Sequence, residues 1–257
     1  MSRGRWASSW LLGAFCATGC GGSGEQDIAA RQEAAAAAAA SALSLTLVAT
    51  ELVSHTVDEP TTTATTLRHD GTCGCPCSDR VGTDDSFVQE LDYEQPSCVP
   101  ITGLLPGRIG GHVWLNYDDG TVEANRSEAW VGDEGEPIVL AIEGTFSGQR
   151  PLWDAELTGE LSVGEQAVGF EGTSIAAGTS LQLDGGLTSG ELSGTFDRLV
   201  LSHQPAFDPC PLAVDGTVRF GDVAVRWEGE QILVDIGGDE ASFAACELSL
   251  DLGDIDD

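Results

Sequence analysis

The chain has 257 residues, 42 of them acidic and 11 basic, and its formal net charge is −31 at pH 7. A field of this sign repels nucleic acids, so we expect no nucleic-acid partner and only weak binding of cations. All the basic residues are arginines, and without lysine the chain has no lysine nucleophile or Schiff-base chemistry. The length suits one large domain or two small ones.

The first twenty residues predict an export signal: two arginines, an uncharged apolar run and small residues that lead to Cys20. This ending resembles the lipobox of bacterial lipoproteins, although Ala17 stands where that family usually has leucine. The resemblance implies that residues 1–19 are removed and that Cys20 is lipidated. Because Gly21 follows rather than an acidic residue, it also implies an outer-membrane anchor, on the periplasmic face or at the cell surface. The alternative is an ordinary secretory signal cut near Ala17.

Residues 20–42 are expected to form an alanine-rich tether, or a short helix, between the lipid and a folded domain. Alanine fills eight of the nine positions from Ala34 to Ala42, and it has the highest helix propensity of all residues. No apolar stripe recurs at helical spacing, so the pattern does not say what this helix would pack against.

Residues 43–257 are expected to form an all-β domain, because apolar and polar residues alternate with a period of two. This pattern is typical of antiparallel strands with one buried face. Turn signals separate the runs, and the whole predicts an antiparallel β-sandwich or barrel-like meander of about a dozen strands. Aromatic residues make up only 6% of the chain, which disfavours a membrane-spanning barrel. The apolar runs include Ile138, Leu140 and Ile142, and Val214, Val218 and Phe220; the predicted tight turns are Asp119-Gly120, Gly164-Glu165, Asp184-Gly185-Gly186 and Gly221-Asp222.

Of the eight cysteines, Cys16 leaves with the signal and Cys20 takes the lipid, and the even number of six that remains in an exported chain predicts three disulfides. Cysteines two positions apart rarely bridge each other without strain, so distant partners are expected and the pairing stays open. The alternative is a zinc or cuprous copper site. The disulfide candidates are Cys73, Cys75, Cys77, Cys98, Cys210 and Cys246, and the metal alternative is His69 with Cys73, Cys75 and Cys77.

A possible binding face follows Gly111. If Val113 and Leu115 point inward, then His112, Trp114 and Asn116 point outward, and an exposed tryptophan beside polar side chains suits a sugar or a protein partner. The alternative is that both faces are covered, or that a bulge reverses the phase.

No catalytic motif is present: the chain has no His-Glu-x-x-His, no phosphate loop and no Gly-x-Ser-x-Gly. Ser202-His203 with Asp208 is interpreted as chance, and acidic turns such as Asp118-Asp119 do not fit a calcium loop. We therefore expect no cofactor and a non-enzymatic, structural or protein-interaction role at the cell envelope. The partner would be an envelope protein or a glycan. The alternatives are a carbohydrate- or small-ligand-binding module at Trp114 and an envelope hydrolase.

Overall fold

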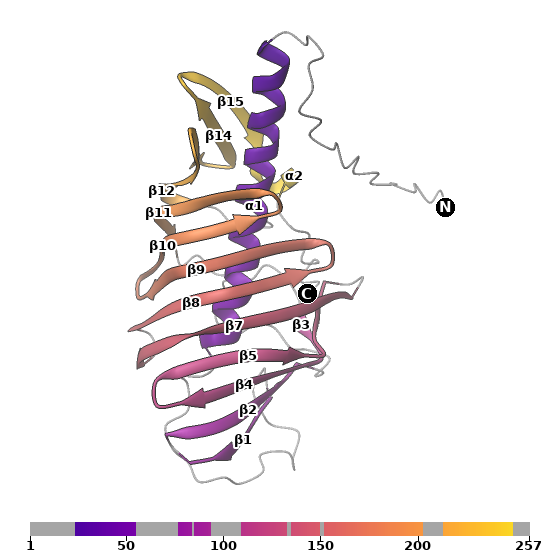
Figure 1. The fold of residues 1–257 in the computed structure, drawn as a ribbon, viewed down its shortest axis with the longest axis vertical. Helices are drawn as coiled ribbons and strands as arrows, with labels where there is room; N and C mark the ends of the chain where they lie inside the picture. The colour runs from indigo at the N-terminus through magenta and orange to yellow at the C-terminus, as the bar shows by residue number, and fades with distance from the viewer. Residues whose placement is uncertain are drawn as a thin grey trace, which may run out of the picture.

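The computed structural model describes residues 24–54, 77–83, 85–93, 109–132, 135–149, 152–202 and 213–248. This part of the chain forms two helices and fifteen strands (Figure 1). In chain order they are α1 (Gly24–Ser54), β1 (Cys77–Gly82), β2 (Ser86–Asp92), β3 (Ile109–Gly110), β4 (His112–Asp118), β5 (Thr121–Ser127), β6 (Trp130–Val131), β7 (Glu136–Gln149), β8 (Leu152–Val163), β9 (Gln166–Ala177), β10 (Ser180–Ser189), β11 (Leu192–Ser202), β12 (Ala213–Phe220), β13 (Val223–Glu228), β14 (Gln231–Ile236), β15 (Asp239–Ala244) and α2 (Ala245–Leu248).

The strands form one antiparallel meander, which confirms the predicted all-β class. Their order in the sheet is β1-β2-β4-β5-β7-β8-β9-β10-β11-β12-β13-β14-β15, while β3 pairs with β6 and β6 pairs with β7. Among the described strands this path is open, with β1 at one end and β15 at the other, so the sheet does not close into a barrel. The helix α1 lies across one face of the sheet, where a sandwich would have its second sheet (Figure 1).

The alternating pattern produces strands with one buried face and one exposed face. Ile138 and Leu140 in β7 are buried, while Val139 between them is 61% exposed. The predicted phase of β12 is wrong at one place: Val214 is exposed and Ala213 is buried. Gly216 lies between Val214 and the buried Val218 with φ at +89°, and the register with β11 shifts in this region, so the alternation reverses.

The helix α1 is much longer than the predicted tether, and it belongs to the folded domain. It continues to Ser54, so residues 43–54 are helical rather than part of a β domain that begins at 43. It packs against β8, β9, β10, β13, β14, β15 and α2. Every residue from Ala42 to Ser54 is buried. A helix that is buried on all sides has no amphipathic stripe, which is why the sequence pattern did not reveal its packing.

Length and composition would also allow α1 to cross a membrane, since an apolar window of 18 residues within Asp27–Ser54 has a mean hydropathy of 1.6. In this structure 83% of that window is buried inside the protein. Most of its hydroxyl groups are satisfied within the helix: those of Thr46 and Thr50 donate to the carbonyls of Ala42 and Thr46, four residues earlier. Glu51 is a charged residue that is also buried, and the residues around it are mainly apolar.

Polar contacts tie the first half of α1 to the last strands. The Arg31 guanidinium lies 2.7 Å from the Asp222 carboxylate, in the turn between β12 and β13. Its hydrogen bond holds the pKa of Asp222 below the ordinary value of 3.8. The Gln32 amide donates to the carbonyl of Asp239, 2.8 Å away, and the Ser41 hydroxyl donates to Gln166 at the start of β9. These contacts set the position of the helix along the sheet.

A row of residues with positive φ crosses the four central strands. Gly159, Gly172, Gly185 and Arg198 have φ of 130°, 56°, 119° and 49°, and each lies thirteen residues after the one before (159, 172, 185, 198). The register shifts beside them, which marks a bulge in each strand pair from β8 to β12. Bulges bend a strand and increase its twist, so the row bends the sheet.

The residue before two of the positive-φ positions helps to hold the row. The Asp184 carboxylate accepts a hydrogen bond from the Arg198 N–H at 2.8 Å, and the Thr158 hydroxyl accepts one from the Gly172 N–H at 3.2 Å. The predicted turn at 184–186 is therefore wrong: it is a bulge inside β10, not a hairpin. In the sequence, an acidic or hydroxyl residue followed by glycine recurs every thirteen residues, at 158–159, 171–172 and 184–185. Asp197-Arg198 continues the same spacing with arginine in place of glycine.

Burial of α1 leads to a first prediction. Leu43→Ala removes a side chain that is 0% exposed, and it should lower the free energy of unfolding by about 2–5 kcal/mol through lost burial and a cavity. Glu33→Ala, on the exposed side of the same helix, should change it by less than about 0.5 kcal/mol. Urea unfolding followed by tryptophan fluorescence measures both. Equal effects would mean that α1 is a free tether after all.

The bulge row leads to a second prediction. A Cβ on Gly159 would lie 2.0 Å from the Ala141 carbonyl oxygen, and its φ of +130° is strained for other residues, so Gly159→Ala should cost about 3 kcal/mol or more. A Cβ on Gly190, in the turn after β10, meets nothing within 4 Å. Gly190→Ala should therefore cost only about 1 kcal/mol of left-handed strain. Thermal unfolding compares the two variants, and a smaller loss for Gly159→Ala would contradict the close approach at the bulge.

Candidate interaction surface

The outward face of β4 carries the side chains that the sequence placed there. Val113 and Leu115 are fully buried, whereas His112, Trp114 and Asn116 are half-buried on the opposite face. The alternation along β4 thus confirms the predicted orientation of this strand. We call His112, Trp114, Asn116, Glu90 on β2 and Arg126 on β5 the Trp114 surface.

Neighbouring side chains stack on the Trp114 ring. Arg126 lies opposite Trp114 on β5, and its guanidinium carbon is 3.9 Å from the ring centroid, a cation–π contact. The His112 ring, two residues earlier on the same strand, stacks at 5.8 Å between centroids and 21° between planes. The tryptophan is therefore already in contact with two side chains that hold it in place.

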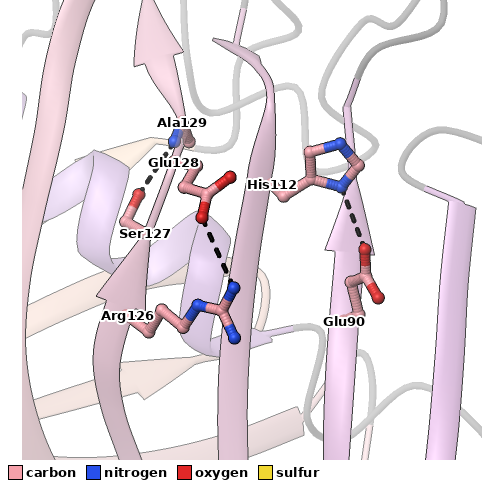
Figure 2. Close-up of polar contacts among 6 residues, drawn as sticks. All are labelled: Glu90, His112, Arg126, Ser127, Glu128 and Ala129. Carbon is pink, nitrogen blue, oxygen red and sulfur yellow. Dashed lines mark hydrogen bonds and ion pairs between the residues drawn. The ribbon is translucent and has the colours of Figure 1, made fainter.

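Carboxylates in turn hold the two stacking residues (Figure 2). The Glu90 carboxylate lies 3.1 Å from His112 Nδ1, and both side chains are only about a quarter exposed, at 26% and 21%. The Glu128 carboxylate lies 3.4 Å from Arg126, but this pair is well exposed and contributes little stability. Ser127 supports the end of the strand, because its hydroxyl accepts the N–H of Ala129 at 3.1 Å.

The Trp114 surface brings together residue types that are common at binding interfaces. An aromatic ring, a guanidinium and an imidazole lie together in fixed positions, and tryptophan and arginine are the residue types that dominate binding energy at protein interfaces. Among the described residues there is no group of three or more side chains suited to hold a metal ion.

Two of the predicted disulfide cysteines can be placed. Cys77 is the first residue of β1, Cys246 lies in α2 directly after β15, and each is disulfide-bonded. A sulfur in a disulfide is not a thiolate ligand, which argues against Cys77 as part of a metal site. Cys246 is helical, as part of the short helix Ala245–Leu248. Eight further residues named in the sequence analysis lie outside the described ranges: Cys20, His69, Cys73, Cys75, Cys98, Cys210, His203 and Asp208.

The sequence did not reveal Arg126, although it is the closest neighbour of Trp114. The turn at Asp119-Gly120 is tight, as predicted, and a regular hairpin from it would place Asn125 opposite Trp114. A register shift between Trp114 and Leu115 inserts one extra residue in β5 and brings Arg126 to that position. A hairpin at Asp119-Gly120 with one bulge in its second strand would have predicted the contact between Arg126 and Trp114 from the sequence.

Comparison with known proteins adds no homologue to this picture. No protein family, no curated protein and no solved structure matches the chain.

The packing on Trp114 leads to a third prediction. Arg126→Ala uncovers part of the ring, so tryptophan emission should shift to the red and acrylamide quenching should increase. The loss of stability should stay below about 1 kcal/mol, because the guanidinium is at the surface. Arg219→Ala, which removes an exposed arginine that pairs with Asp197 at 3.2 Å, is the matched control and should leave the emission unchanged. An unchanged spectrum in Arg126→Ala would mean that the stacking does not persist in solution.

Proposed function

We propose that this protein is an exported, lipid-anchored component of the outer membrane that binds a protein partner through the Trp114 surface. The anchor is supported by the basic and apolar start of the chain and by the small residues before Cys20. The binding role is supported by one observation above all: Trp114 is half-buried on an outward sheet face, and Arg126 and His112 both stack on its ring.

The contacts of Trp114 favour a protein over a glycan as partner. A sugar ring binds a tryptophan by stacking on its face, and the face of Trp114 is already in contact with Arg126 and His112. A protein partner can instead contact the edge of the ring together with the guanidinium and the imidazole. The carbohydrate-binding alternative would require at least one of these side chains to move away. A hydrolase gains no support from the contacts of the described residues.

Charge indicates what kind of protein surface would fit. The net charge is −31, and besides Glu90 within the Trp114 surface, four acidic side chains lie around it: Asp79, Asp92, Glu123 and Glu128. Complementary potentials speed association and reject partners of like charge. The partner proposed here therefore presents a basic surface.

The disulfide framework belongs to the same proposal. An open sheet has two free edges, which can pair with other chains unless they are protected. Cys77 begins the strand at one edge, and Cys246 follows the strand at the other edge. Three disulfides among the six cysteines would restrain both ends of the meander in the oxidising space outside the cytoplasm.

A fourth prediction tests the binding role. An arginine-rich peptide should bind the protein and change its tryptophan emission, whereas neutral oligosaccharides should not. Trp114→Ala should weaken peptide binding about 30-fold, the effect of a hot-spot residue worth about 2 kcal/mol. Val139→Ala, which shortens another exposed outward side chain of the sheet, is the control and should bind like the wild type. Binding of oligosaccharide in place of peptide would support the carbohydrate alternative instead.

A further inference from the structure

The direction of α1 relates the start of the chain to one end of the sheet. Arg31 contacts the turn between β12 and β13, and Gln32 bonds to the first residue of β15. Ser41, further along the helix, reaches β9. The first turns of α1 accordingly lie beside β14 and β15, and the helix runs from there along the sheet towards β8 (Figure 1).

This direction is held firmly, because α1 is a core element. Its window of 18 apolar residues is 83% buried, and leaving the sheet would expose both the helix and the strands that it covers. The ion pair between Arg31 and Asp222 and the bond from Gln32 would also break. The position of Gly24 relative to the sheet is therefore fixed by the packing of the helix.

Very little chain separates this helix from the proposed anchor. Gly24 follows Cys20 by four residues (24 − 20), a length of chain that spans at most about 14 Å. If Cys20 carries the lipid, as the proposed function requires, the end of the sheet formed by β13, β14 and β15 must lie close to the bilayer.

Charge disfavours a protein that lies flat on the membrane. Exposed carboxylates are spread over the sheet from β5 to β13, for example Glu123, Glu143, Glu156 and Glu228. Anionic lipids would repel all of them in a flat orientation, but only those near one end in an upright one. We propose that the protein stands upright on its anchor, with the β13–β15 end toward the membrane and the Trp114 surface at the distal end.

The upright orientation narrows the class of partner. Eight strand spacings separate β4 from β13 along the sheet, a distance of about 38 Å at 4.8 Å per spacing. The Trp114 surface is thus held well above the head groups of the membrane that carries the anchor. Its partner is then a basic protein surface in the aqueous space or on the facing layer of the envelope, and not one embedded at the level of the same head groups.

Energy transfer from the protein to the bilayer tests this orientation. The lipidated full-length protein is placed in vesicles of phosphatidylethanolamine and phosphatidylglycerol that contain an acceptor-labelled lipid. A donor dye is attached through an azide-bearing residue at Glu230, in the turn after β13, or at Val81, on β1 and 71% exposed. Ten strand spacings separate β1 from β13, about 48 Å, so transfer from position 230 should be several-fold higher than from position 81.

Two controls separate the possible failures. Intact mass shows whether Cys20 carries acyl chains, and a protein without them would refute the anchor and with it the orientation. With the lipid present, equal transfer from both positions, or higher transfer from position 81, would overturn the upright orientation while leaving the anchor intact. Insertion of twenty glycine and serine residues before Gly24 lengthens the reach by about 25 Å and should lower the transfer from position 230. No change after this insertion would contradict the short link as its cause.

Discussion

Burial of one sheet face beneath α1 is the interaction on which the rest of the structure depends. An open meander of antiparallel strands has an apolar face that must be covered, and here a helix covers it along β8, β9, β10, β13, β14 and β15. Small alanines such as Ala36 and Ala39 are buried in this core, and so are larger leucines such as Leu43 and Leu47. What looks like a low-complexity spacer is the central element of the core.

The shape of the sheet follows from that requirement. A flat sheet would contact a helix along a narrow line, whereas bulges bend the strands and add twist. The positive-φ residues at 159, 172, 185 and 198 place one such bend in each of four successive strands. Asp184 and Thr158 stabilise the bends by accepting backbone N–H groups of the next strand. The same device in consecutive strands gives a regular curvature without any glycine-rich loop.

The Trp114 surface depends on the same kind of irregularity at the other end of the sheet. One extra residue in β5 brings Arg126 over the indole, and Glu90 on the neighbouring strand holds His112. Because β4 lies eight strand spacings from β13, this surface is in the half of the sheet that is distant from the start of the helix (Figure 1). A lipid at Cys20 would then place the membrane anchor at one end of the sheet and the proposed binding surface towards the other end.

The sequence by itself determined the strands, their antiparallel order and the outward face of β4, because the alternation of apolar and polar residues is a local property of each strand. It also marked the tight turn at Asp119-Gly120. Only the tertiary structure decided where α1 packs. Residues 42–54 of this helix are buried on all sides, and such a helix has no apolar stripe that would indicate its neighbours. Tertiary structure likewise decided that 184–186 is a bulge and that Arg126 meets Trp114. A shift of one residue between paired strands changes every contact across them, and that shift is set by the packing of the whole sheet rather than by either strand alone.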